Sequence, residues 1–368
     1  MAMKQPWISS ARTDLGFIVG PAFVITAIVV LLKDKIALIG DTPPWLWLLL
    51  IVGVDVSHVY STIFRTYLDK EELQKRQMLY TLAPLAAWIV GVLLYSMDAL
   101  AFWRALAYLA VFHFVRQQYG FMMIYARGER ERPKLTRHLD QAAIYLATLF
   151  PIAWWHCHKM TIQWFVEGDF FYINKPALAW FAGIVFAVVM AAYAVKEVYY
   201  ARKEGRVNVP KNLLLLGTAL SWSVGIVIFN NDLAFTATNV IAHGIPYTAL
   251  IWIYGRNQRD MHPRATPYVS RVFNKFFTAK MIPVYLGLLF ALAFIEEGVW
   301  DGFVWREHGE IFGFSHLLPQ VQSEYIMVWL VPLLSLPQSV HYVLDAFIWK
   351  HNLKDSEWKK ILLHRPSA

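Results

Sequence analysis

Long apolar runs alternate with short polar segments along the whole of this 368-residue chain. A helix rises about 1.5 Å per residue, so roughly 20 apolar residues cross the hydrocarbon layer of a membrane. Ten runs fit such a helix, with predicted bounds Leu15–Leu32, Pro44–Phe64, Met78–Met97, Phe102–Tyr125, Leu139–Trp155, Pro176–Ala194, Leu213–Phe229, Leu233–Tyr254, Met281–Ile295 and Ile326–Trp349. The pattern predicts an all-α, polytopic transmembrane helix bundle of about ten helices, forming one integral membrane domain over residues 1–368.

The composition agrees with residence in a bilayer. Hydrophobic residues make up 57% of the chain and charged residues 16%, whereas about a quarter of an ordinary soluble domain is charged. The first apolar run follows basic residues as a signal peptide does, but no small-residue cleavage site follows it, so we expect a retained helix. The net charge of +8 reflects loops that face anionic lipid, and we expect no nucleic-acid partner.

Positive charges are distributed unevenly between the two sides of the predicted bundle. With a cytoplasmic N-terminus, the outside segments contain only five basic residues: Lys33, Lys35, Lys159, Lys175 and Arg306. Nearly all the others fall in inside segments, which predicts that both termini are cytoplasmic, in a bacterial inner membrane. The longest outside segment, residues 296–325, mixes acidic and aromatic residues and is expected to lie at the interface as a structural cap.

Four of the twelve histidines fall within predicted helices: His58, His113, His243 and His341. Their helices are the second, fourth, eighth and tenth, which all run in the same direction. Counted from the inside ends of these helices, their depths differ by only about 10 Å. We therefore expect one shared polar centre in the inner half of the membrane. The other six helices are expected to carry no buried Asp, Glu or His and to serve as scaffold.

Polar side chains accompany these histidines one helical turn away. Asp55 precedes His58 by three residues and Asp345 follows His341 by four, spacings that place both members of a pair on one helix face. Burying a carboxylate in hydrocarbon costs on the order of 3 kcal/mol on insertion scales, and a bound cation offsets that cost.

These observations define a predicted site. The predicted metal ligands are His58, His113, His243, His341, Asp55 and Asp345. Asp55, Asp345 and Arg116 are the predicted catalytic residues, with the two aspartates as ligands or general bases. Gln117 and Asn239 are expected to support the site by orienting an imidazole, and Arg116 to neutralise a buried carboxylate or hold a polar head group.

The available ligands restrict the choice of metal. Cys157 is the only cysteine, so thiolate zinc sites, iron–sulfur clusters and covalent c-type haem lack their ligands. Histidine with carboxylate suits non-haem iron, mono- or dinuclear, with zinc, manganese or haem b as alternatives. His156 and His158 resemble a metal motif, but a spacing of two residues does not place both rings on one helix face.

Three segments, Ser57–Asp69, Phe112–Phe121 and His341–Lys350, resemble signatures of uncharacterised bacterial polytopic membrane proteins. In pattern, single histidines on separate helices are also similar to the bacterial Brp/Blh carotene dioxygenases, membrane enzymes that hold iron through helix histidines. That resemblance covers four short stretches and implies an iron centre, but the carotene substrate is not carried over. The histidine boxes of membrane fatty-acid desaturases are absent, which argues against that family.

The sequence thus predicts a metal-dependent membrane oxidoreductase or oxygenase, with non-haem iron as the expected metal. Its expected substrate is apolar, such as a fatty acyl chain, an isoprenoid or a carotenoid that enters from the lipid bilayer, and an electron donor protein is an expected partner. Two alternatives use the same residues: a b-type haem electron carrier, and a proton- or ion-coupled transporter. The sequence shows no internal repeat of the kind that transporters carry, which weakens the last of these.

Overall fold

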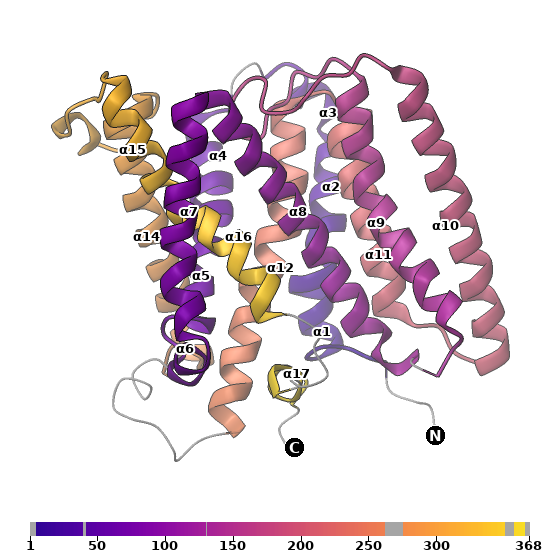
Figure 1. The fold of residues 1–368 in the computed structure, drawn as a ribbon. Helices are drawn as coiled ribbons and strands as arrows, with labels where there is room; N and C mark the ends of the chain where they lie inside the picture. The colour runs from indigo at the N-terminus through magenta and orange to yellow at the C-terminus, as the bar shows by residue number, and fades with distance from the viewer. Residues whose placement is uncertain (1–4, 40–41, 130, 262–274, 350–356, 365–368) are drawn as a thin grey trace. The chain divides into compact units, whose positions relative to one another are not determined.

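The computed structural model describes residues 5–39, 42–129, 131–261, 275–349 and 357–364. Every regular element within these residues is helical (Figure 1), as the apolar runs predict. Seven helical spans are long and apolar enough to cross a membrane, and one bent helix pair would make an eighth. The count of about ten stays a prediction, because the long helices α9 (Lys134–Cys157) and α12 (Asp232–Met261) are not among these spans.

The first of two compact units comprises residues 1–40 and 114–246. Helix α11 packs against α2 and α9, and α9 also packs along α10. The elements that lie entirely in this unit are α1 (Ala11–Asp14), η1 (Leu15–Val19), α2 (Gly20–Leu31), α3 (Lys33–Ile36), η4 (Ala126–Glu129), α9, α10 (Pro176–Glu204), α11 (Val209–Trp222) and η5 (Ser223–Ile228).

Buried charges join the helices of this first unit. Lys211 of α11 is fully buried, and its Nζ lies 2.6 Å from a carboxylate oxygen of Glu129 and 2.7 Å from one of Glu197. Lys196 of α10 forms ion pairs with Asp140 of α9 and with Glu197. Each buried charge therefore has partners of opposite sign, which is the condition for keeping it out of water.

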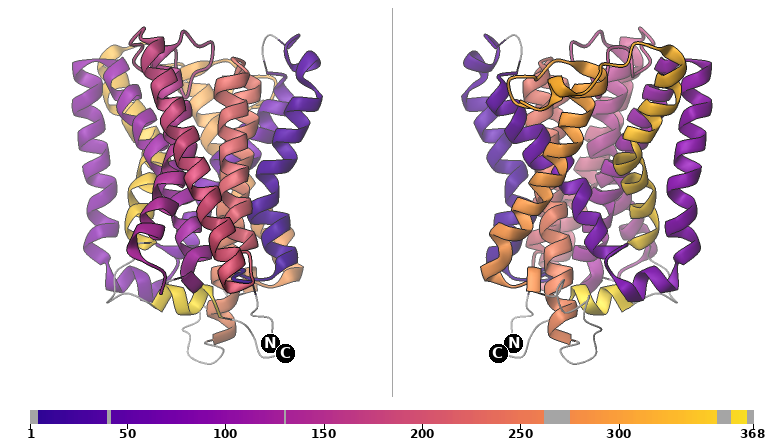
Figure 2. Two further views of the ribbon diagram at one scale, coloured as in Figure 1. Left: turned by 90° about the vertical axis from the view of Figure 1, so that its right-hand side faces the viewer. Right: turned by 90° about the vertical axis from the view of Figure 1, so that its left-hand side faces the viewer.

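The second unit comprises residues 41–113 and 247–368. Helices α15 and α16 run beside α7 (Figure 2), and α14 packs against η2 and α5. The elements entirely in this unit are α4 (Pro44–Trp47), η2 (Leu48–Val56), α5 (Ser57–Ser61), η3 (Thr62–Arg65), α6 (Lys70–Lys75), α7 (Gln77–Met97), η6 (Ala279–Met281), α14 (Ile282–Trp300), η7 (Asp301–Trp305), η8 (Ser315–Leu317), α15 (Glu324–Leu334), α16 (Leu336–Ile348) and α17 (Glu357–Leu362).

Two continuous helices belong to both units. Helix α8 (Ala99–Tyr125) passes from the second unit to the first between His113 and Phe114. Helix α12 passes from the first unit to the second between Pro246 and Tyr247. Residues on either side of each boundary therefore keep the spacing of a single helix.

The tenth predicted helix, Ile326–Trp349, is two helices rather than one. Helices α15 and α16 meet near Ser335 and are bent by 42°. Pro337 lies in the first turn of α16, where its nitrogen has no hydrogen to donate to the carbonyl of the preceding turn. The apolar run is continuous across the bend, so hydropathy alone does not reveal it.

Buried carboxylates are more widespread than the sequence predicts. Asp14, Asp140 and Glu296 lie on the helices that contain the first, fifth and ninth predicted apolar runs, and they are at most 8% exposed. Glu296 lies inside α14, which continues to Trp300, whereas the predicted helix ends at residue 295 and an outside segment begins at 296. Glutamate is a good helix former, so an acidic residue at the end of an apolar run does not end the helix. The expectation of six purely apolar scaffold helices is therefore wrong.

The end of the short helix α17 accepts hydrogen bonds from a buried side chain of α12. Asn257 is fully buried, and its Nδ2 donates to the carbonyls of Ile361, Leu362 and His364 at 3.1, 2.9 and 3.2 Å. The last carbonyls of a helix have no partner within the helix. The Asn257 amide supplies that partner, and so fixes the end of α17 in the second unit.

Candidate metal centre

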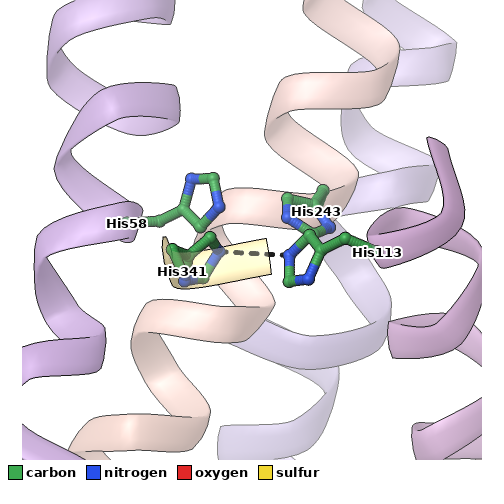
Figure 3. A group of neighbouring side chains, drawn as sticks. All are labelled: His58, His113, His243 and His341. Carbon is green, nitrogen blue, oxygen red and sulfur yellow. Dashed lines mark hydrogen bonds between the residues drawn. The ribbon is translucent and has the colours of Figure 1, made fainter. Parts of the chain in front are cut away.

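Three predicted ligands, His58, His113 and His341, come together in the second unit (Figure 3). They lie on α5, α8 and α16, and each is at most 3% exposed. One ring nitrogen of each lies within 4.8 Å of those of the other two. The Nε2 atoms of His113 and His341 are 3.1 Å apart, as the dashed line in Figure 3 marks. Three separate helices thus deliver imidazole nitrogens to one buried point.

The separation of 3.1 Å between those two Nε2 atoms has a chemical meaning. Neighbouring nitrogen ligands with bonds of about 2.1 Å, at angles of about 90 to 109°, lie about 3.0 to 3.4 Å apart. Two histidines on opposite faces of a haem lie about 4 Å apart, because the iron stands between them at a similar bond length. The observed distance therefore fits neighbouring ligands of one ion better than the two axial ligands of a haem.

Thr62 contacts the opposite edge of the His341 ring. Its Oγ1 lies 2.6 Å from Nδ1 of His341 and 2.9 Å from the hydroxyl oxygen of Tyr247. The Tyr247 hydroxyl in turn donates to the carboxylate of Asp345. These contacts are all satisfied when His341 carries its proton on Nδ1 and donates it to Thr62, which donates to Tyr247. That arrangement leaves the lone pair on Nε2 of His341.

Asp345 lies beside the corresponding edge of His113. Its Oδ2 is 3.5 Å from Nδ1 of His113. When that nitrogen carries the proton, the proton faces the carboxylate and the lone pair is on Nε2; with the proton on Nε2 instead, His113 donates a hydrogen bond to Nε2 of His341. Two lone pairs 3.1 Å apart repel each other unless a cation or a proton lies between them. A carboxylate behind the imidazole is also the common support of a metal-bound histidine.

Asp55 stands next to the third ring. Its Oδ1 lies 3.7 Å from Nδ1 of His58, and 34% of the Asp55 side chain is exposed. The residue belongs to the π-helical segment η2, which precedes α5 directly. Such π-helical turns occur frequently at functional sites, because they alter the direction of side chains relative to a regular α-helix. Direct binding of the ion by Asp55 and by Asp345 stays a prediction.

His243 belongs to the part of α12 in the first unit and is 1% exposed. Its ring stacks on Phe114, with centroids 3.5 Å apart and an angle of 9° between the planes. Phe114 directly follows His113 in α8, and Tyr247 follows His243 by one turn of α12. His243 thus contacts the residue that follows His113 in sequence and lies on the helix that carries Tyr247.

The two predicted supporting amides donate to main-chain carbonyls. Nε2 of Gln117 lies 3.0 Å from the carbonyl oxygen of His243, in the turn where Pro246 removes one N–H donor from the helix. Nδ2 of Asn239 lies 3.1 Å from the carbonyl oxygen of Phe235. Both amides therefore support the backbone of α12, whereas the sequence predicts a contact to an imidazole ring.

Arg116 lies on an exposed face of α8. Its guanidinium donates to the hydroxyl of Tyr145 at 2.7 Å and lies 4.7 Å from the centre of the Tyr119 ring. Within the first unit, the guanidinium is therefore stabilised by one hydrogen bond and by cation–π attraction. Its predicted catalytic role remains a prediction.

His156 and His158, at the end of α9, form hydrogen bonds with main-chain carbonyls of the same helix. Nδ1 of His156 lies 2.7 Å from the carbonyl oxygen of Ile152, and Nδ1 of His158 lies 3.0 Å from that of Trp154. Neither belongs to a group of three metal-ligating side chains within the described part of the chain. The two rings thus contact different carbonyls, and their spacing of two residues does not place them on one helix face.

The residues predicted from the sequence to form the site do not include Thr62 or Tyr247. Thr62 follows His58 by four residues, and Tyr247 follows His243 by four, so a search for polar side chains one turn from each histidine finds both. Their importance depends on contacts with His341 and Asp345, which lie far away in the sequence. Only the fold reveals those contacts.

Comparison with known proteins finds no matching family model, no similar curated protein and no similar solved structure. The case for a function therefore depends on the geometry of the site.

Proposed function

We propose that this chain is a metal-dependent membrane oxidoreductase whose ion is non-haem iron, bound by His58, His113 and His341. One observation carries the proposal: two Nε2 atoms lie 3.1 Å apart while the Nδ1 edges of the same rings face Thr62 and Asp345. A cation placed between these nitrogens removes the repulsion of their lone pairs. Iron supplies one-electron redox chemistry to such a site of nitrogen and oxygen ligands.

We propose His243 as a fourth ligand, because α12 carries it one turn before Tyr247 and its ring stacks on Phe114, the neighbour of His113. Asp345 then acts through His113 and Tyr247 rather than as a ligand. Asp55, which is partly exposed beside His58, is the residue suited to accept or donate a proton.

An apolar substrate fits the surroundings of this centre. The helix that carries His341 contributes Val340, Leu344 and Ile348 to a buried hydrophobic cluster with Tyr80 of α7, so this helix lies in an apolar environment. We propose that a fatty acyl, isoprenoid or carotenoid chain enters from the bilayer and that an electron donor protein supplies reducing equivalents. We further propose a location in a bacterial inner membrane with both termini cytoplasmic, on the distribution of basic residues.

Metal analysis tests the proposal directly. Protein purified without chelators and without oxygen should contain at least one equivalent of iron per chain by elemental analysis. His341→Ala and His58→Ala should lose it, whereas His138→Ala, at an exposed position on α9, should retain it. Loss in His243→Ala supports the fourth ligand, and retention there with loss in the other two restricts the site to three histidines.

The alternatives predict different results in the same preparation. An intense Soret absorption band would assign the protein to the haem electron carriers. Metal-free protein that moves protons in liposomes in a pH-dependent manner would assign it to the transporters. Either outcome, or wild-type protein that binds no transition metal, would overturn the proposed function.

A further inference from the structure

A row of carboxylates lies beside the histidine group on a different helix. Ala293 of α14 packs against Val52 and Val56 of η2, in one buried cluster. Glu297 and Asp301 follow Ala293 at steps of four residues, so they continue the face of α14 that meets η2. Asp55 lies next to Val56 in η2 and interacts electrostatically with Glu297 of α14. Packing of these two elements thus brings carboxylates of η2 and α14 to the same side of the second unit.

Glu296 is the least satisfied of these groups. It is 8% exposed, and neither carboxylate oxygen has a partner in hydrogen-bonding geometry among the described residues. The side chains of Tyr60 and Trp300 are its polar neighbours. Asp301 is 2% exposed and accepts two main-chain N–H groups through Oδ1, but its Oδ2 has no such partner. Buried carboxylate oxygens without donors are costly unless something positive meets them.

These carboxylates form a series rather than a cage. Glu297 is within electrostatic reach of Glu296, Asp55 and Asp301, and Asp55 is 3.7 Å from the ring of His58. Within the described residues, Asp55, Glu296 and Glu297 form no ion pair with a Lys or Arg, and only the histidine group is compact enough to hold an ion. A single ion therefore cannot be held by all of them at once, but each can hold it in turn.

We propose that Asp301, Glu297, Glu296 and Asp55 form the entry route by which a divalent cation reaches the histidine centre. The inference rests on the proposed metal function and adds the path of loading. Carboxylate oxygens exchange partners more readily than imidazole nitrogens, which bind iron, zinc and cobalt more tightly. A cation that passes from Asp55 to the histidines therefore meets its strongest ligands last.

The rate of cobalt loading tests this route. Chelator-treated full-length protein in lipid nanodiscs is mixed with Co²⁺, and the visible absorption of the bound ion is followed with time. Glu297→Gln and Glu296→Gln should load about tenfold more slowly, because a row of like charges raises the arrival rate of an ion by that order or more. Their equilibrium affinity for Co²⁺ should match the wild type, since the histidine ligands are unchanged.

Glu324→Gln, which removes an exposed carboxylate at the start of α15, is the matched control and should load at the wild-type rate. Glu297→Lys should be slower than Glu297→Gln, which keeps the test decisive if Glu296→Gln fails to fold. Equal loading rates in all variants would overturn the route while leaving the metal centre intact. Wild-type protein that binds no Co²⁺ at all would instead count against the proposed function itself.

Discussion

Asp345 meets His113 at the edge of the ring that faces away from His341. Its Oδ2 lies 3.5 Å from Nδ1 of His113, while Nε2 of the same ring is 3.1 Å from Nε2 of His341. The same carboxylate accepts a hydrogen bond from Tyr247, which contacts Thr62 behind His341. One aspartate is thereby connected to the back edges of two rings, and it sets the direction in which both present their lone pairs.

Replacing Asp345 with alanine should weaken metal binding by about 10- to 100-fold, as expected when the residue that orients a ligating histidine is removed. Competition with a chromogenic chelator measures this change. Asp98→Asn, at an exposed position before α8, should bind metal as the wild type does. Complete loss of metal from Asp345→Ala even at saturating concentration would show that Asp345 is itself a ligand.

Thr62→Val should reduce both metal affinity and stability. The substitution keeps the shape of the side chain but removes the oxygen that contacts His341 and Tyr247, and buried groups left without partners cost about 1–3 kcal/mol. Thr62→Ser retains the hydroxyl and should behave nearly as the wild type in metal titration and thermal unfolding. If valine and serine are equivalent, the hydroxyl does not orient the ring.

Two glycines within helices should respond differently to alanine. At Gly255 of α12, an added Cβ lies 2.4 Å from ring atoms of the buried Phe277, so Gly255→Ala should destabilise the fold by about 1–3 kcal/mol. At Gly120 of α8, nothing lies within 4 Å. Gly120→Ala should therefore be neutral or stabilising by up to about 1 kcal/mol, the helix-propensity difference. Thermal unfolding in one detergent compares the two.

Lys211→Met should destabilise the protein strongly. Its buried ammonium lies between Glu129 and Glu197, and breaking a buried ion pair by removing one partner costs about 3–5 kcal/mol. Lys203→Met, at an exposed position of α10, is the matched control and should change stability by less than about 0.5 kcal/mol. A small effect at Lys211 would indicate that water or protonation compensates the remaining carboxylates.

The convergence of His58, His113 and His341 could be predicted because it follows from helix direction and depth, which apolar runs and basic residues encode. The roles of Asp345 and Thr62 could not be predicted. A spacing of four residues places a side chain on the same helix face as a histidine, but it does not show which edge of a ring on another helix that side chain contacts. Glu296 was missed for another reason: hydropathy treats every acidic residue as outside, while a packed helix can bury one. Hydropathy does not show the bend at Ser335, because the apolar run around it is continuous, but Pro332 and Pro337 are a sequence signal for a kink there.

Because Asn257 of α12 donates hydrogen bonds to α17, the stability of the part of α12 that follows Tyr247 depends on the last helix that the structure describes. Asn257 lies on α12 about 15 Å beyond Tyr247 along the helix. Truncation before residue 357 would leave its buried amide without acceptors, at a cost of about 1–3 kcal/mol. An affinity tag or fusion partner that pulls α17 away from α12 would have the same effect, so labels for purification and imaging belong elsewhere on the chain.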